Sequence, residues 1–528
     1  MDALPIFQNI AWCKDNWSLP SITDQNKKLI HQCTTLAVIE LTDNMEEIIE
    51  KSKAFPIPFP IETVRLEYLK TLRPIKRLQR NITSTYPLIH ERVLILLAKF
   101  LNYKREFGSD IEKALYNDMT VPELIDRILK KRALCFVGPH DKYRLLNGEK
   151  GTGGWEEIGT SKEKPPLILE NCLSYDEMKI SSMVYVSGYT ECINNGTRCN
   201  NGVVSNDAEE EAIIIGLIGP RFVRRGKMDY EDILITKEQN CPENGYGERE
   251  ARNDSKMLKA DPTTQSIQSK QALREMWAEF YGTDTLVYSE SFFKDVKNKT
   301  DQSTARYQHV IKGKKINCIF DNEVYYKRIV VLAEATLIEA EARAKGSGKN
   351  AFVNVIGCGL GIWMISKHQT DAYIVTFLER MTAFLKKDML NHVTDVNFGY
   401  IKCGPDTEAI FKDRREKGVK KLFLKSETHP KGGISVQLEN REPSSRLVGE
   451  HAGKLLVLTY PWDSNAHPGN EFWYGKLHTS GDPAAACSTQ VSELHNAHVN
   501  PAVSAANARV AGGCRLKTLS DYCLALTA

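Results

Sequence analysis

The sequence of 528 residues predicts an α/β fold preceded by a helical N-terminal region. After residue 132, short runs rich in β-branched and aromatic residues alternate with segments of helical periodicity. Residues 351–385 read as an apolar strand, a glycine-rich turn and a long amphipathic helix, an order typical of layered α/β folds. These observations predict a largely parallel or mixed sheet, and at roughly 150 residues per domain the length allows two to four domains.

Residues 1–130 are expected to form a helical accessory region. Apolar residues recur every three to four positions in 91–107 and in 121–134, which is the spacing of a helix face. The three prolines of 55–60 predict an extended break, because each fixes φ and removes a backbone donor. No catalytic constellation stands out in this region. We therefore expect a second domain over residues 131–528.

The predicted strands of the second domain share apolar, β-branched composition and lie between Gly- and Asn-rich turns. They are 133–137, 183–189, 211–219, 316–320, 396–403, 420–425 and 453–462. Helices are expected at 271–281 and 323–346, the second ending at Gly346 as its C-cap. The polar residues 240–270, broken at Asp261-Pro262, predict a long loop or insertion.

Charge and hydropathy restrict the partners and the compartment. The 70 Lys and Arg against 67 Asp and Glu give a net charge of +3, which argues against a nucleic-acid partner, and we expect the basic run 224–227 to be a solvated face. The N-terminus has no basic stretch before an apolar one, so it is not a signal peptide. The apolar runs 93–98 and 212–219 fall short of the ~18 residues of a membrane span. We expect a cytoplasmic protein without a membrane partner, whose thirteen cysteines are reduced.

A glycine turn lies between the strand and the helix of residues 351–385, at Gly357, Gly359 and Gly361. Glycines there allow positive φ and close approach of another group, and the N-terminus of a following helix suits a diphosphate. A tight turn without a ligand and the glycine motif of an S-adenosylmethionine-dependent methyltransferase are the alternatives. The methyltransferase is disfavoured because no acidic residue lies just upstream, and Asp395 precedes the next strand instead of ending it.

The most informative stretch is 455–490, where three carboxylates and four aromatic rings follow a buried-looking strand. Loops after strands are where α/β folds place their sites. One carboxylate can activate a water and another can hold sugar hydroxyls, while flat rings can stack on a base or flank a ribose. The structural alternatives are a helix N-cap for Asp482, a turn for Asp463 and a core position for the rings.

Two other chemistries find less support. The first is nucleophilic catalysis by a cysteine, either Cys487 or Cys358, with His467, His478 or His495 as the base. No recognised cysteine-protease signature surrounds either thiol, and free cysteines more often serve as small core residues. The Cys192 and Cys199 pair does not have zinc spacing, and no Cys/His quartet occurs elsewhere. We therefore expect no cofactor and no metal site, although the carboxylates alone leave metal binding open.

Six stretches together resemble the MavL-like proteins, which are atypical macrodomain-related ADP-ribosyl hydrolases. They are 193–202, 219–240, 320–328, 353–363, 460–473 and 480–489, and the resemblance covers roughly residues 130–510. It implies a macrodomain-like α/β/α sandwich with ADP-ribose bound in a cleft. It also implies hydrolysis of the bond that joins ADP-ribose to a side chain, with arginine the linkage associated with the family, so the expected partners are ADP-ribose and an ADP-ribosylated protein.

The resemblance also implies the site residues. The family's acidic residues fall on Asp463, Glu471 and Asp482, and Glu471 departs from the family's aspartate by one methylene. Asp482 would activate water, Asp463 would grip the ribose hydroxyls, and Glu471 would assist the leaving group, with an oxocarbenium-like transition state stabilised by the anions. Crowded carboxylates raise one another's pKa. The implied ligand-binding residues are Asn354, Gly357, Cys358, Gly359, Leu360, Gly361, Trp462 and Trp473.

A third possibility, a non-catalytic reader of ADP-ribose, needs the same cleft. The crowded carboxylates favour hydrolysis, because a reader gains little from placing anions near an anionic ligand.

Overall fold

A large mixed sheet is the centre of the computed structural model, which describes residues 10–14, 17–36, 39–247, 262–299, 304–313, 316–413, 420–513 and 515–528. Within these residues the sheet has eleven strands, in the order β12-β13-β14-β11-β10-β15-β6-β5-β1-β16-β17. Their bounds, in that order, are Lys412–Asp413, Lys420–Lys425, Gly433–Leu438, Val393–Gly399, Ala351–Ile356, Leu455–Pro461, Glu211–Leu217, Val184–Glu191, Tyr86–His90, Arg509–Gly512 and Arg515–Thr518.

The five strands β14, β11, β10, β15 and β6 are parallel to one another, and β13 and β5 join them antiparallel on the two sides. Strands β10, β11 and β15 are almost wholly buried, as the near-continuous apolar runs in their sequences require of a parallel sheet covered on both faces. The predicted α/β fold with a mixed sheet is confirmed.

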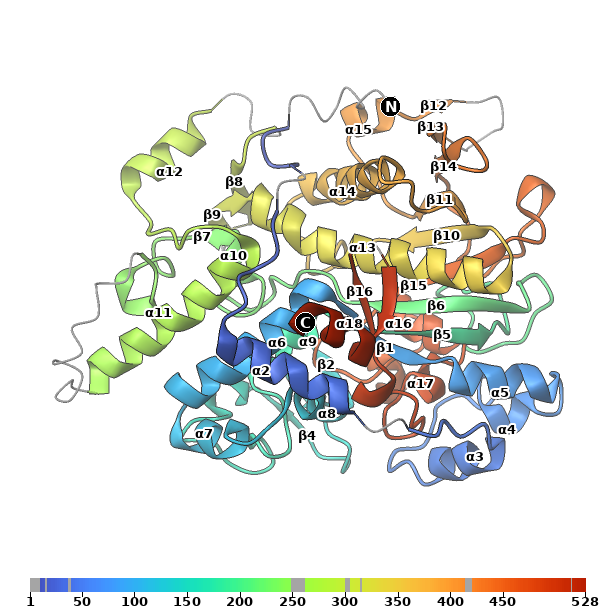
Figure 1. Cartoon of the computed structure of the whole chain (residues 1–528), viewed down its shortest axis with the longest axis horizontal. Coiled ribbons are helices and arrows are strands. Elements are labelled where there is room, and N and C mark those ends of the chain that lie inside the picture. Colours follow the sequence, from blue (N-terminus) through green and yellow to red (C-terminus); the bar gives the residue numbers. More distant parts are fainter. Residues whose placement is uncertain are drawn as a thin grey trace.

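Helix α13 (Asn322–Ser347) packs along the sheet, and α14 (His368–Leu385) lies beside it (Figure 1). Helices α5 (Ile75–Thr83) and α16 (Gly481–Ala486) pack on β5 and β15. The predicted C-cap of α13 was wrong by two residues, because the left-handed residue is Gly348 with φ 65° while Gly346 stays inside the helix.

The described residues up to 130 contain a series of helices. Helix α6 spans Glu91–Phe107 and α8 spans Val121–Lys130. Besides α5, the described part of this region contains α2 (Asp24–His31), α3 (Met45–Lys53), α4 (Leu66–Leu69) and α7 (Asp110–Tyr116). This region also supplies β1, which pairs with β5 and β16 inside the main sheet. The division of the chain near residue 130 stays a prediction.

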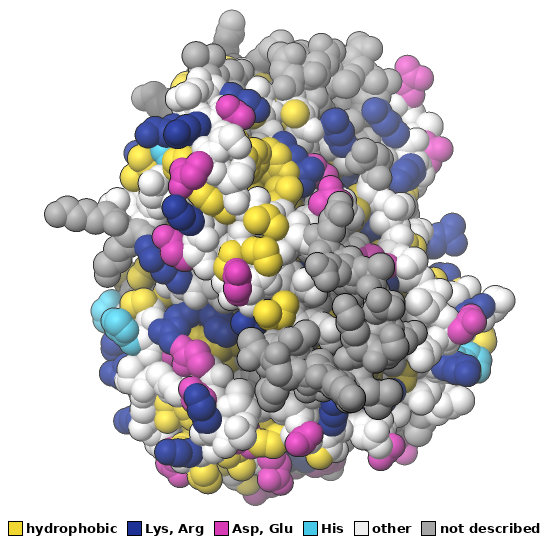
Figure 2. Space-filling model, turned by 90° about the vertical axis from the view of Figure 1, so that its left-hand side faces the viewer, with side chains coloured by type: hydrophobic (Ala, Val, Ile, Leu, Met, Phe, Trp, Pro, Cys, Tyr) yellow, Lys and Arg dark blue, Asp and Glu magenta, His cyan; other side chains and the backbone are white. Residues whose placement is uncertain are grey.

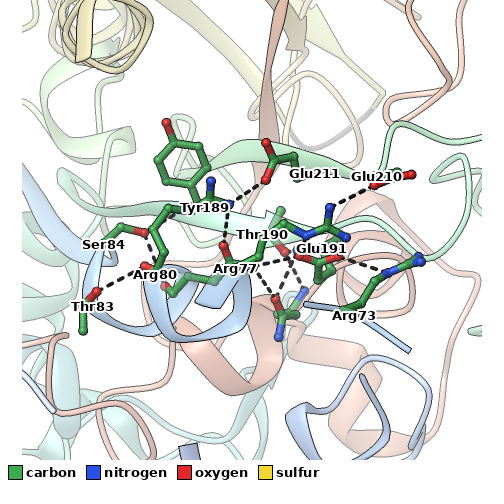
Figure 3. A network of polar contacts seen from close by, with 12 residues as sticks. Arg73, Arg77, Arg80, Thr83, Ser84, Tyr189, Thr190, Glu191, Glu210 and Glu211 are labelled. Carbon is green, nitrogen blue, oxygen red and sulfur yellow. Dashed lines mark hydrogen bonds and ion pairs between the residues drawn. The ribbon is translucent and has the colours of Figure 1, made fainter. Parts of the chain in front are cut away.

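An arginine network joins α5 to the sheet (Figure 3). Arg77 donates from Nε and Nη2 to the two carboxylate oxygens of Glu191 at 2.8 and 2.7 Å, and Glu191 is fully buried. The remaining Nη1 of Arg77 donates to Glu210 at 2.9 Å, and Arg80 donates to Glu211 at 2.7 Å. The two-point geometry is specific to an arginine fork, so the network fixes where α5 lies against β5 and β6.

The described residues between 234 and 321 form a side unit. A small sheet of β7 (Leu234–Ile235), β9 (Ile316–Asp321) and β8 (Tyr307–Lys312) lies with α11 (Pro262–Tyr281) and α12 (Glu290–Lys297). The loop predicted for 240–270 was wrong from residue 262 onward, because Pro262 is the first residue of α11, a position that suits proline. Residues 248–261 lie outside the described part.

On the face shown in Figure 2, acidic and basic side chains are interspersed, and hydrophobic ones gather near its middle.

A second small sheet precedes the site. It contains β2 (Cys135–Val137), β3 (Lys142–Arg144) and β4 (Lys150–Thr152). The further helices are α9 (Tyr175–Ser181), α10 (Tyr230–Ile233), α15 (Pro405–Ala409), α17 (Val491–Leu494) and α18 (Leu519–Thr527). Among the described residues no helix combines the length and the apolar character that crossing a membrane requires.

Candidate functional site

The segment after β15 brings the three predicted carboxylates together. Asp463 lies two residues beyond the end of β15, Glu471 lies in the 3₁₀ helix Asn470–Tyr474, and Asp482 lies in the first turn of α16. Gly469 and Gly475 flank the 3₁₀ helix with φ of 102° and 73°. These left-handed conformations, which glycine adopts without strain, turn the chain back so that Glu471 faces the other two acids.

The three acids differ in burial and in hydrogen bonding. Asp482 is 2% exposed; its Oδ1 accepts a hydrogen bond from the Gly469 backbone N–H at 2.8 Å, and its Oδ2 has no partner among the residues described. Asp463 is half-buried and accepts from the side-chain amide of Asn470. Glu471 is also half-buried, with the Ser480 hydroxyl donating to it at a long 3.5 Å. None of the three has the set of donors that would satisfy a carboxylate fully.

Removal from water raises the pKa of each acid. Asp463 has its pKa raised to about 7 by desolvation and by the charge of Glu471, against the opposing effects of Arg221 and Asn470. Desolvation also raises the pKa of Glu471, and it raises the pKa of Asp482 well above the usual range with added repulsion from Asp463 and Glu471. With a pKa of about 7, the Asp463 carboxyl is shared between its protonated and charged forms near neutral pH. Such a group supplies both an acid and a base, as carboxylate hydrolases require.

A cavity of about 710 Å³ opens beside these acids, a volume typical of small-molecule sites. Asp463, Asn470 and Glu471 form one part of its wall, while Asp482 is not part of the wall. The rest of the wall carries basic and apolar side chains, including Lys142, Arg221, Lys312, Lys476, Phe136, Phe222, Ile316, Ile362 and Trp363. The cavity therefore joins an acidic end to cationic and aromatic surfaces.

Arg221 is one of the cavity residues that sequence analysis missed. It is 3% exposed, and its guanidinium lies 4.6 Å from the ring centre of Phe136 and 5.6 Å from that of Trp363. Its Nε has no hydrogen-bond partner within the described ranges. The residue lies just past the end of β6, next to the basic run 224–227, and its position after a strand was the one signal in the sequence.

The glycine turn does not have the predicted relation to a helix. Helix α14 begins at His368, so a loop separates Gly361 from the helix N-terminus, which is not available at the turn. The turn packs on another loop instead: a Cβ at Gly219 would lie 2.2 Å from the Cys358 carbonyl carbon, and one at Gly359 would lie 2.9 Å from the Pro220 oxygen. Close backbone packing therefore explains Gly359, whereas a Cβ at Gly361 would meet nothing within 4 Å.

The other predicted ligand-binding residues of this turn also lie off the cavity wall. The wall does not include Asn354, Gly357, Cys358, Gly359, Leu360 or Gly361. Asn354 is fully buried and accepts from the Asn397 amide at 2.8 Å. The residues that follow the turn, Ile362, Trp363 and Ile365, are on the wall. The turn borders the cavity through these neighbours.

The two predicted ribose-flanking rings are core residues. Trp462 is 3% exposed, donates its indole N–H to the Ala466 carbonyl at 3.0 Å and lies under the Arg132 guanidinium at 4.0 Å. Trp473 is 1% exposed, and its ring centre lies 5.2 and 5.0 Å from those of Phe55 and Phe59. Neither ring lines the cavity, and the ring of Trp473 is buried against Phe55 and Phe59 of the N-terminal region.

The thiol–imidazole alternative is weakened by burial. Cys358 and Cys487 are fully buried, which raises the pKa of each thiol to about 12 and keeps it protonated. Burial lowers the pKa of His467 and of His495 to about 3.

Within the described residues, no group of three or more His, Cys, Asp or Glu side chains is arranged to hold a metal ion.

Comparison with known proteins gives two concordant findings. Residues 46–524 match the model of a family described as ADP-ribosylhydrolase MavL-like. The chain is 37% identical over 495 residues to ADP-ribosylarginine hydrolase CG3568 of Drosophila melanogaster, which covers 93% of this chain and 90% of that protein. It is 35% identical over 503 residues to ADP-ribosylarginine hydrolase CG2909 of the same organism, with 93% and 91% covered.

Proposed function

The chain belongs to the MavL-like ADP-ribosylhydrolase family, and we propose that it removes ADP-ribose from arginine side chains of modified proteins by hydrolysis. The observation that carries this proposal is the cavity that joins the Asp463 and Glu471 carboxylates to Arg221. A bound ADP-ribose needs a cation near its diphosphate and an anion near the ribose carbon whose bond is broken.

Arg221 supports a diphosphate position in the cavity. Its guanidinium is held between two rings and has unused donor capacity, and Lys142, Lys312 and Lys476 add positive charge to the same wall. A planar guanidinium pairs with phosphate oxygens through two parallel hydrogen bonds. The proposal therefore places the diphosphate against Arg221 and no longer at the glycine turn.

The carboxylates support the hydrolytic step. The C1–N bond breaks with its electron pair moving to the guanidine nitrogen while a water oxygen bonds to C1, and the transition state resembles an oxocarbenium ion. We assign Asp463 to the ribose hydroxyls and the developing positive charge. Glu471, which also reaches the cavity, takes the water proton and returns it to the leaving guanidine, which becomes guanidinium. General base catalysis of this kind contributes typically ~10²–10⁴-fold.

Asp482 takes a different part in this proposal from the one expected from the sequence. The sequence favoured it as the base, but it is 2% exposed and lies off the cavity wall. Burial, with added repulsion from the two other acids, raises the pKa of Asp482 well above its usual range. We assign it to holding the Gly469 backbone, and through it the position of Glu471.

The proposal extends to architecture and setting. We infer a macrodomain-like arrangement, with residues 131–528 as the hydrolase domain, residues 1–130 as its helical accessory region and a polar insertion near 240–270. The proposed partners are ADP-ribose and an ADP-ribosylated protein in the cytoplasm, with neither nucleic acid nor membrane involved. The net charge of +3 supports the absence of a nucleic-acid partner.

Two measurements test the function. The wild-type protein should release ADP-ribose from a peptide modified at arginine, detected by chromatography, and regenerate unmodified arginine. Calorimetric titration with ADP-ribose should show binding, with S-adenosylmethionine as the parallel control. Binding without release would identify a reader, and binding of S-adenosylmethionine alone would move the assignment to the methyltransferase.

A further inference from the structure

Three consecutive residues, 469–471, either bind or supply the three carboxylates of the site. Gly469 donates its backbone N–H to Asp482 at 2.8 Å, Asn470 donates its side-chain amide to Asp463, and Glu471 is itself the third acid. The geometry of the acids therefore depends on how this tripeptide is fixed, and Asn470 is its central residue.

The strand β2 fixes the amide of Asn470. The backbone N–H of Phe136 donates to Oδ1 of Asn470 at 2.9 Å, and Nδ2 of Asn470 donates to the Phe136 carbonyl at 3.1 Å. These two bonds define which side-chain atom is oxygen and which is nitrogen, because a flipped amide would place donor against donor and acceptor against acceptor. The second N–H of the amide is thereby directed at Asp463.

The position also selects the residue type. Asn470 is 1% exposed and has φ 33°, a left-handed conformation in which asparagine and aspartate are enriched among non-glycine residues. Of these two residues, only asparagine provides both the acceptor for Phe136 and a donor for Asp463.

Charged and titratable groups face Asp463 from several elements. Glu471 repels its charge from the 3₁₀ helix, and Arg221 attracts it from the loop after β6. Asp482 of α16 and the Cys135 thiol of β2 belong to the same cluster, and removal from water holds the pKa of Cys135 far above its usual range, so the thiol is neutral. Desolvation and the charge of Glu471 thus oppose ionisation of Asp463, while the Arg221 guanidinium and the Asn470 amide favour it.

We propose that Asn470 is a positioning residue whose amide, locked by the backbone of β2, donates to the Asp463 carboxylate and aims it into the cavity. Its catalytic meaning rests on the proposed hydrolase function. Asn470 acts through Asp463, since its amide hydrogens are used by Phe136 and Asp463. Strand β2, which is far from the acids in the sequence, therefore helps to position Asp463 through Asn470.

Two variants and a control test the proposal. Asn470→Asp keeps the backbone preference and the acceptor for Phe136 but replaces the donor facing Asp463 with another acid. Asn470→Ala removes both the acceptor for Phe136 and the donor for Asp463. Asn507→Ala is the control, because the buried Asn507 amide donates to the backbone carbonyls of Thr85 and Ala502.

The kinetic measurement is the pH profile of kcat/KM for release of ADP-ribose from an arginine-modified peptide. Loss of a hydrogen bond to a charged group lowers kcat/KM by about tenfold to a hundredfold at neutral pH. The acid limb should move upward by about one pH unit or more in both variants, so activity recovers at high pH. Asn507→Ala should lower activity, if at all, without moving the limb. An unmoved limb in both Asn470 variants would overturn the proposal.

A second measurement needs no substrate, so it separates failure of this inference from failure of the hydrolase function. The loss of unfolding free energy caused by Asn470→Ala is measured by denaturant titration at about pH 5 and about pH 9, on either side of the pKa of Asp463 at about 7. Backbone strain is the same at both pH values and cancels. We expect the larger loss of unfolding free energy at high pH, where Asp463 is charged. Equal losses at the two pH values would show that Asn470 stabilises only the contact with β2, and would overturn the proposal.

Discussion

Replacement of Arg221 by glutamine is the substitution that separates ligand binding from fold most clearly. The guanidinium lies on the cavity wall between the rings of Phe136 and Trp363, at 4.6 and 5.6 Å from their centres. Glutamine keeps part of the length and polarity of the side chain but removes the charge and the planar fork. The change therefore addresses the proposed phosphate contact directly.

The expected size follows from the environment of Arg221. A hydrogen bond to a charged group contributes about 1.5–3 kcal/mol, and each 1.4 kcal/mol corresponds to about a tenfold change in Kd. The Kd of ADP-ribose should therefore rise by about tenfold to a hundredfold. Loss of this charge also raises the pKa of Asp463 further above its usual range, because Arg221 opposes the shift in the wild-type protein.

Calorimetric titration with ADP-ribose and with adenosine measures the effect, and Arg224→Gln is the matched control. Arg224 is 3.5 Å from Asp141, the same buried carboxylate that Arg221 approaches at 3.8 Å, but Arg224 lies off the cavity wall. Arg221→Gln should weaken ADP-ribose binding and leave adenosine binding unchanged. An unchanged Kd for ADP-ribose, or an equal loss in Arg224→Gln, would refute the reasoning.

Three further predictions concern stability and the expected ribose contacts. Folded Asp463 keeps its proton up to about pH 7, whereas an unperturbed carboxyl loses it near 3.8, so the folded state binds more protons between these pH values. The free energy of unfolding should therefore fall as the pH rises from about 4 to about 7, and it should fall less steeply in Asp463→Asn. A series of denaturant titrations with the same slope in both proteins would contradict the raised pKa of Asp463. Glu191→Gln should cost about 3–5 kcal/mol by denaturant titration because it breaks the buried pair with Arg77. Glu210→Gln, on the 68% exposed partner of the same arginine, should cost below about 1 kcal/mol, and equal costs would disprove the role of burial. Trp473→Phe should leave the Kd of ADP-ribose unchanged in calorimetry, because the ring is 1% exposed and off the cavity; a large rise in Kd would restore its ribose-flanking role.

The elements with strong periodicity were predictable from the sequence. Helix α6 begins and ends where its apolar spacing indicates, and β6 and β15 lie within their apolar runs. The strand β1 was not predicted, because five residues with a proline inside a helical region give no periodic signal, and only pairing with β5 and β16 defines it. Long-range pairing of this kind leaves little trace in local sequence.

The site was predictable only in part, for a related reason. Acid residues near the end of a strand indicated Asp463, Glu471 and Asp482, and the structure brings them together. Sequence spacing does not show which acid is sealed from the cavity, and Asp482 is sealed. Arg221 escaped because its role arises from Phe136 and Trp363, which are distant in sequence. Ligand binding by the glycine turn stays a prediction, and the packing of Gly359 against Pro220 was not evident from the sequence.

The most direct test of the central claim is single-turnover release of ADP-ribose from an arginine-modified peptide by the wild-type protein and by Glu471→Gln. Glu471 lies on the cavity wall, and glutamine preserves its shape while removing its ability to take a proton. We predict release by the wild-type protein and a rate constant lower by about a hundredfold or more in Glu471→Gln, with ADP-ribose bound by both. Equal rate constants in the two proteins, or no release by the wild-type protein despite binding, would contradict carboxylate-assisted hydrolysis in this cavity.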